Sequence, residues 1–182
     1  PTLWNQFDIQ TVNREGLILE LSESELKEQT YFSIPELPRM EGFGGITLDM
    51  RISLQDLSAG QILLDTRNVN GRGMVVKTGK YGTIQLTLSN GEVSSTWSSD
   101  AGLIEAYGIH QVTVIVHSGP RIITFVVNGI VCDGRNYRPF GWGRFDGQIN
   151  NINGDKLRIE GLKTGQGKPQ GKMKHFRIYS RN

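Results

Sequence analysis

Residues 108–134 constrain the fold of this chain more than any other stretch. They hold two apolar runs joined by short turns. In 110–117, valines alternate with polar residues, the period-two pattern of a strand with one buried face. The second run, 121–127, is almost continuously apolar and predicts a strand buried on both faces, and the Asn128-Gly129 pair after it is a strong hairpin signal. These features predict antiparallel sheets packed as a sandwich.

The rest of the chain repeats this organisation, because Gly, Asn and Ser interrupt short apolar runs at intervals of roughly ten residues, the spacing of all-β folds. Residues 1–182 are long enough to form one such domain with its own core. One segment, 22–29, has Ser22 and Glu25 at capping-box spacing and predicts either a two-turn helix or a charged loop. The predicted strands are 16–21, 30–34, 45–53, 61–66, 73–78, 83–88, 92–98, 156–160 and 173–180.

Composition excludes several classes of protein. The chain carries 20 basic and 18 acidic residues, a balance that argues against a nucleic-acid binder driven by phosphate neutralisation. Its one cysteine, Cys132, rules out an internal disulfide framework and a Cys-rich zinc site, and its apolar neighbours predict a small core residue. No apolar run reaches membrane-spanning length and no signal peptide starts at Pro1. A domain cut from a larger, secreted chain would show these same features.

The order of these segments resembles a laminin-G-like domain of the concanavalin A-like lectin/glucanase class. The resemblance covers about Phe43 to Asn182. It rests on a strand leading to the Val127-Asn128-Gly129 turn and on the Arg177-Ile178-Tyr179 sequence of the last strand. It implies an all-β fold, a jelly-roll sandwich of two curved antiparallel sheets with the N- and C-terminal strands adjacent. These are turn and core positions, so they predict a scaffold rather than a chemistry.

The spacing of the acidic residues does not favour a catalytic site. Glycoside hydrolysis needs two carboxyl groups converging on one bond, and glucanases of the resembled class carry them two residues apart on a strand. The acidic runs here are 20–28, with the wrong spacing, and 146–155, in a Gly- and Asn-rich loop. The sequence therefore favours a non-catalytic domain, with a glycoside hydrolase as the alternative.

Metal binding is also weakly indicated. His110, His117 and His175 do not form a spaced metal site, and His110 is expected to make a structural hydrogen bond. The Asp- and Asn-rich loop 146–155 has the oxygen ligands that Ca²⁺ prefers, and laminin-G-like domains often hold such a site. An ordinary Asn/Gly turn loop is the favoured interpretation, with calcium left open and no other cofactor expected.

A sugar-binding site needs aromatic side chains that stack on the sugar ring, beside side chains that make paired hydrogen bonds with its hydroxyls. Two places offer them: the loop 133–146, where aromatic, Arg and Asp residues interleave, and the middle strands around 65–72, which in the resembled fold build the concave sheet where relatives hold glycans. In the loop, Phe140 and Phe145 are expected in the core, and Trp142 is either in the core or in the site; Trp97 is expected to pack inward. The predicted carbohydrate-binding residues are Asp65, Arg67, Arg72, Asp133, Tyr137, Trp142 and Arg144.

The sequence thus predicts a lectin-like, non-catalytic carbohydrate-binding or accessory domain of a secreted polysaccharide-processing protein. Its expected partner is a glycan or polysaccharide, together with other domains of a larger chain, and its expected location is extracellular, at the cell surface or periplasmic. A protein-interaction or adhesion domain is a further alternative, which would require an exposed apolar patch.

Overall fold

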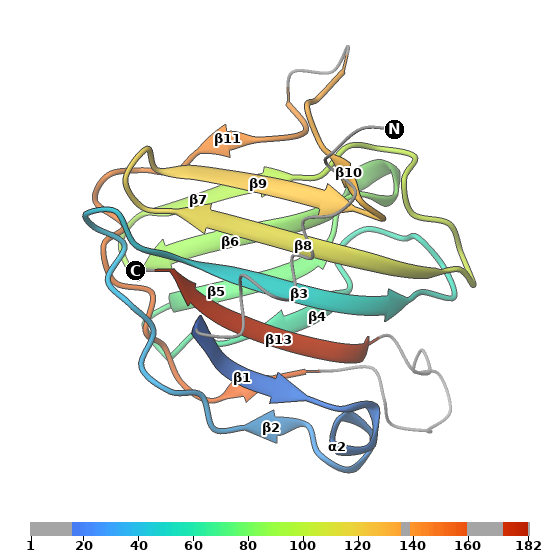
Figure 1. Ribbon diagram of the computed structural model, residues 1–182, viewed down its shortest axis with the longest axis horizontal. Coiled ribbons are helices and arrows are strands. Elements are labelled where there is room, and N and C mark those ends of the chain that lie inside the picture. The colour runs from blue at the N-terminus through green and yellow to red at the C-terminus, as the bar shows by residue number, and fades with distance from the viewer. Residues whose placement is uncertain (1–15, 136–138, 160–172, 182) are drawn as a thin grey trace.

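Two antiparallel sheets lie face to face in the computed structural model, which describes residues 16–135, 139–159 and 173–181 (Figure 1). The seven-stranded sheet has the order β1 (Leu17–Leu21), β13 (Met173–Arg181), β3 (Gly45–Ser53), β8 (Ile109–His117), β9 (Ile122–Val127) and β10 (Ile130–Val131), with β11 (Gly143–Arg144) paired to β9. The six-stranded sheet has the order β2 (Tyr31–Phe32), β12 (Leu157–Arg158), β4 (Ile62–Asp65), β5 (Arg72–Thr78), β6 (Ile84–Asn90) and β7 (Ser94–Ser98). These sheets confirm the predicted all-β jelly-roll sandwich.

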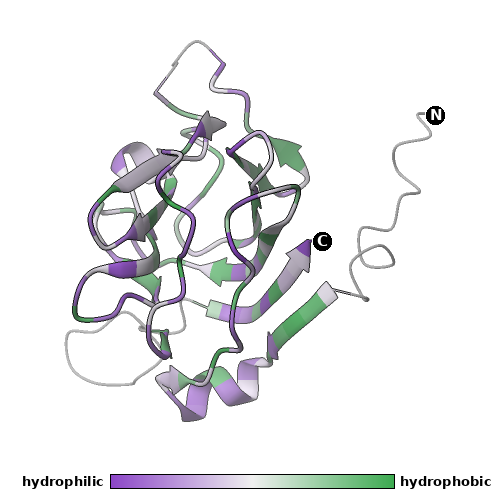
Figure 2. Cartoon of the chain, turned by 90° about the vertical axis from the view of Figure 1, so that its left-hand side faces the viewer, coloured by the Kyte–Doolittle hydropathy of each residue, from purple (hydrophilic) through white to green (hydrophobic). Residues whose placement is uncertain are grey.

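The core lies between the sheets and follows the alternation of the sequence. On β3, Ile46, Leu48 and Met50 are fully buried, as predicted, because successive side chains of a strand point to opposite faces. Apolar and polar residues alternate along the strands in Figure 2 as well. Phe125 of β9 and Phe176 of β13 are among the largest fully buried side chains. Cys132 is also fully buried, which confirms its place in the core.

Two details of burial differ from the prediction. The run that forms β9 was expected to be buried on both faces, but its burial alternates, and Ile122, Thr124 and Val126 are partly exposed. The reason is that these three side chains point away from the core, toward the open outer face of the seven-stranded sheet. The alternation of 173–180 predicts that Tyr179 faces outward with His175 and Arg177. It is only 7% exposed, since its cross-strand partners Leu17 and Thr47 flank it.

The first described elements form one border of the sandwich. β1 pairs with β13, which confirms that the terminal strands are adjacent. The sequence predicted either a helix or a charged loop after β1, and the structure has the helix, α2 (Glu23–Glu28). Ser22 is its N-cap, and the backbone amide of Ser22 donates to the Glu25 carboxylate at 2.8 Å. Leu26 anchors this helix in the core. A short 3₁₀ turn, η3 (Lys80–Gly82), joins β5 to β6.

Candidate functional site

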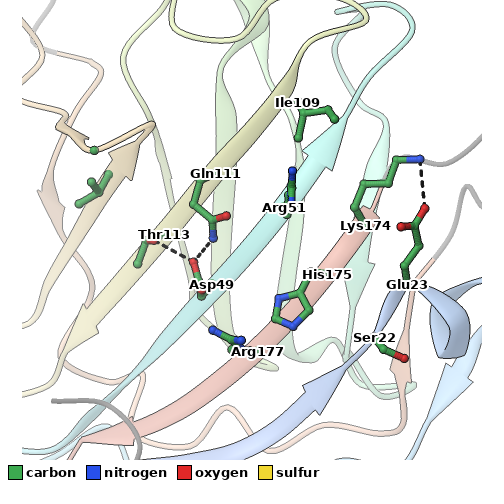
Figure 3. Close-up of a pocket in the computed structure, with 12 residues that line it drawn as sticks. Ser22, Glu23, Asp49, Arg51, Ile109, Gln111, Thr113, Lys174, His175 and Arg177 are labelled. Carbon is green, nitrogen blue, oxygen red and sulfur yellow. Dashed lines mark hydrogen bonds and ion pairs between the residues drawn. The ribbon is translucent and has the colours of Figure 1, made fainter. Parts of the chain in front are cut away.

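A groove of about 830 Å³ lies on the outer face of the seven-stranded sheet (Figure 3). Its floor comes from β13, β3 and β8, and its ends come from the start of α2 and the turn between β9 and β10. Its lining residues are Ser22, Glu23, Asp49, Arg51, Ile109, Gln111, Thr113, Val126, Gly129, Lys174, His175 and Arg177.

Strand register arranges the floor in two rows. One row runs across β13, β3, β8 and β9, and the other across β13, β3 and β8. Cross-strand neighbours on one face stand about 4.5–5.5 Å apart, so each row forms a continuous strip of side chains. The rows are Arg177, Asp49, Thr113 and Val126, and His175, Arg51 and Gln111.

The wall beside α2 is charged, and its carboxylates are held by cations. Glu20 of β1 accepts a hydrogen bond from Arg177, and its Oε2 lies 3.6 Å from His175 Nε2. Glu23 Oε1 lies 3.3 Å from Lys27 Nζ and 3.5 Å from Lys174 Nζ. The hydrogen bond and charge of Lys27 are the main reasons that the pKa of Glu23 is below its ordinary value.

The two charged residues of β3 are placed differently. Asp49 accepts hydrogen bonds from Gln111 and, at 3.1 Å, from Thr113 Oγ1 (Figure 3). Arg51 is exposed, and within residues 16–135, 139–159 and 173–181 no carboxylate pairs with it. Its guanidinium therefore has donors available to an incoming acceptor, at the centre of the second row.

The opposite wall is apolar. Ile109, at the start of β8, is 57% exposed, and Val126 and Gly129 complete this side. The groove thus offers cationic donors and a carboxylate acceptor near β13 and β3, and apolar surface near β9. Such a groove suits a ligand with hydroxyl or carboxylate groups on one side and methyl or methine groups on the other.

Three described carboxyl groups have a pKa that is shifted toward the ionised form. A glycosidase acid needs a raised pKa, which keeps its proton near neutral pH. Among the described carboxyl groups with a resolved shift, which are those of Glu23, Glu25 and Asp65, the pKa is lowered in every case. Of these three, Glu23 lines the groove, and its lowered pKa keeps its carboxylate ionised near neutral pH.

Two of the predicted site residues, Asp65 and Arg67, lie on the other sheet. Asp65 ends β4 and is 8% exposed; its Oδ2 accepts from Arg67 Nη2 at 2.7 Å and from Arg158 Nη2 at 3.3 Å. Burial raises the pKa of Asp65, but the hydrogen bonds and charges of these two arginines lower it by more. A hollow of about 250 Å³ opens beside them.

Arg72, at the start of β5, has a structural contact instead. Its Nε donates to the backbone carbonyl of Asn153 at 2.7 Å and so braces the loop before β12. It does not line the hollow beside Asp65.

Asp133, Trp142 and Arg144 lie at the β7–β11 border, three strands from β4. Asp133 Oδ1 accepts from the Arg135 amide, Trp142 is 50% exposed, and the carbonyl of Arg144 accepts from Trp97 Nε1 at 2.9 Å. Tyr137 lies outside the described residues. The structure therefore separates Asp65, Arg67 and Arg72 at β4 and β5 from Asp133, Trp142 and Arg144, and puts none of these six in the groove.

The other aromatic and polar predictions have mixed outcomes. Phe145 is buried and Trp97 packs against the core, as predicted. Phe140 is only half-buried, because it meets the exposed ring of Tyr81 edge-on at 6.2 Å rather than a core layer. His110 makes the expected structural hydrogen bond, accepting from the Glu105 amide at 3.0 Å.

The loop 146–155 uses its side-chain oxygens in turns. Asp146, Asn151 and Asp155 each accept a hydrogen bond from a nearby backbone amide. In the described part of the chain, no group of three or more His, Cys, Asp or Glu residues is placed to hold a metal ion. No helix of that part is long and apolar enough to cross a membrane.

Sequence reasoning missed the groove, although a signal for it was present. The alternation of 45–53 and of 173–180 predicts that Asp49, Arg51 and Arg177 face outward. The structure brings them together because β13 pairs with β3, which places Arg177 opposite Asp49.

Solved structures with a similar fold share little sequence with this chain. The CBM40 domain of the Ruminococcus gnavus IT-sialidase, bound to α2,3-sialyllactose, matches with a TM-score of 0.57 and 14% identity over 90% of this chain and 92% of that one. A botulinum neurotoxin type C structure, of a protein that interacts with two ganglioside molecules, matches with a TM-score of 0.60 and 12% identity over 93% of this chain but 49% of that one.

Domains LG4-5 of the mouse laminin α1 chain match with a TM-score of 0.52 and 12% identity, over 92% of this chain and 42% of that one. No family model matches the chain, and no curated protein matches its sequence. These likenesses show the fold, a concanavalin A-like jelly-roll sandwich, and so confirm at the level of the fold the resemblance stated from the sequence.

Proposed function

We propose that this chain is a non-catalytic carbohydrate-binding domain whose groove on the seven-stranded sheet takes an acidic glycan. The observation that carries the proposal is Arg51, an exposed cation without a described ion-pair partner, placed between Gln111 and His175 on the groove floor. A guanidinium binds a carboxylate through paired, charge-assisted hydrogen bonds.

The surroundings of Arg51 fit the rest of a sugar. Asp49, Gln111 and Thr113 form a hydrogen-bonded group that can accept from and donate to hydroxyls. Ile109 and Val126 offer apolar contact to the ring or to a methyl substituent. Two proteins of similar fold are described with sialyllactose and with gangliosides. Both ligands contain an acidic sugar residue, and this supports the choice of ligand class.

The proposal extends to the setting of the domain. A glycan-binding role is consistent with an accessory domain of a polysaccharide-processing protein that acts outside the cell or in the periplasm. Protein adhesion is the second candidate, favoured by the exposed apolar side chains of Ile130 and Val131 on the border strand β10.

Calorimetry with sialyllactose and with neutral lactose tests the proposal. The acidic sugar is expected to bind more tightly, and Arg51→Ala to weaken its binding about tenfold or more, because a hydrogen bond to a charged group contributes roughly 1.5–3 kcal/mol. Lys80→Ala, an exposed change on η3 and remote from the groove lining, is the matched control and should bind like the parent protein. Equal affinity for both sugars, or unchanged binding by Arg51→Ala, would refute the assignment.

A further inference from the structure

We propose a second binding site, on the six-stranded sheet, for an oxyanion carried by a single sugar ring, either a carboxylate or a sulfate ester. The site is the hollow of about 250 Å³ lined by Tyr31, Asp65, Arg67, Asp155, Lys156 and Arg158. It is separate from the groove, since the two share no lining residue.

Strand pairing builds the site from three neighbouring strands. Tyr31 of β2 is the cross-strand partner of Arg158 on β12, and Arg158 is the partner of Asp65 on β4. The three side chains therefore stand in one row on the outer face of the sheet. Arg67 follows β4, and Lys156 precedes β12. Both line the hollow next to this row.

Asp65 holds the cationic groups in position. Its carboxylate is almost buried. It accepts hydrogen bonds from Nε and Nη2 of Arg67 at 2.9 and 2.7 Å, and from Nη2 of Arg158 at 3.3 Å. The Arg67 amide adds a bond to Oδ1 at 2.9 Å. A guanidinium fixed in this way loses little further freedom on binding a ligand, which is the benefit of preorganisation.

The charge of the hollow favours an anion. Three cations line it, Arg67, Lys156 and Arg158, against the carboxylates of Asp65 and Asp155. The side chains of Arg67 and Arg158 are still 39% and 33% exposed, so they face solvent beyond Asp65. Lys156 is exposed and pairs with no carboxylate among the described residues.

Tyr31 is placed to contact the sugar ring of the ligand. Its side chain is 59% exposed at the rim of the hollow, and a flat aromatic face packs well on the apolar face of a sugar. The volume lies just below the range of about 300–1,000 Å³ that holds drug-sized ligands, which fits one ring rather than an oligosaccharide.

Amide chemical-shift titrations of the intact chain test the site. The probes are glucuronate and glucose 6-sulfate. Glucose is the neutral control, and inorganic sulfate is the control without a sugar ring. Shifts are expected around Tyr31, Asp65 and Lys156 with both acidic sugars, weaker binding with inorganic sulfate, and none with glucose. Carboxylate and sulfate sources are distinguished by which of the two sugars binds more tightly.

Variants make the outcome decisive. Tyr31→Ala and Lys156→Ala alter exposed side chains and should each weaken binding about fivefold, the effect of roughly 1 kcal/mol, without altering the fold. Arg67→Ala should weaken it further. Arg51→Ala, in the groove, should leave these shifts unchanged, which separates this site from the proposed function. Shifts confined to groove residues, equal binding of glucose or inorganic sulfate, or unchanged affinity in Tyr31→Ala and Lys156→Ala would overturn the proposal.

Discussion

Asp65 and Arg51 are both charged side chains on the outer faces of their sheets, and they differ in what surrounds them. Arg67 and Arg158 close over Asp65 and leave its carboxylate 9% exposed, whereas Arg51 stays open in the groove. A charge surrounded by partners fixes local structure, and one left open is available to a ligand. This contrast gives Asp65 an anchoring role and supports the proposed ligand-binding role of Arg51.

The lowered pKa of Asp65 gives a pH-dependent contribution to stability. Since the folded pKa is below the unfolded value of about 3.9, this contribution is fully present above that value and is lost as the pH falls through the folded pKa. Asp65→Asn should therefore be less stable than the parent protein at pH 7, with a difference that shrinks below about pH 4. Urea midpoints measured from pH 7 to pH 2 check this, and a pH-independent difference would contradict it.

At the scale of elements, β11 shows how a loop is fastened to the border between the sheets. Its two residues pair with β9, and the Trp97 indole of β7 donates to the Arg144 carbonyl across the gap between the sheets. A Cβ built on Gly143 would lie 1.9 Å from the Trp97 ring, so the indole packs directly on the glycine backbone. Glycine at this position is required by close approach.

Gly143→Ala should therefore destabilise the protein by about 1–3 kcal/mol, the usual cost of overpacking. Denaturant unfolding measures it. Arg144→Ala, one residue along the same strand and exposed, is the control and should change stability by no more than about 0.5 kcal/mol. Equal stability of the two variants would show that Trp97 moves aside without cost.

At the scale of the whole molecule, the groove and the hollow beside Asp65 lie on opposite sheets. The loop 146–155 connects β11 to β12. Its Asp and Asn side chains accept hydrogen bonds from the backbone, which contribute to the order of the loop. The sandwich has its own large apolar core besides.

Stability is accordingly predicted to be independent of calcium. Thermal unfolding with excess EDTA and with excess calcium chloride should give the same midpoint, because a cation that binds only the folded state would raise it. An upward shift with calcium, absent with magnesium, would show a site that the turn hydrogen bonds do not reveal.

Most elements could be predicted from the sequence, and the site could not. The strand 45–53 has its predicted bounds, and the capping box of Ser22 and Glu25 forms as its spacing indicated. The period-two pattern and the cap are local properties of the backbone, readable from neighbouring residues. In β9 the same reasoning failed, because an apolar run does not show whether anything covers its second face.

The sequence by itself determined which residues of most strands face inward, where the chain turns, and that two antiparallel sheets enclose the core. Only the tertiary structure decided which outward residues meet. Arg51, Gln111 and His175 are far apart in the chain and adjacent in the groove. Asp65 and Trp142, predicted to share a site, lie in separate parts of the molecule, on β4 and beside β11. Alternation follows from the pleat of a single strand, but strand order and register follow from burying all the apolar faces at once.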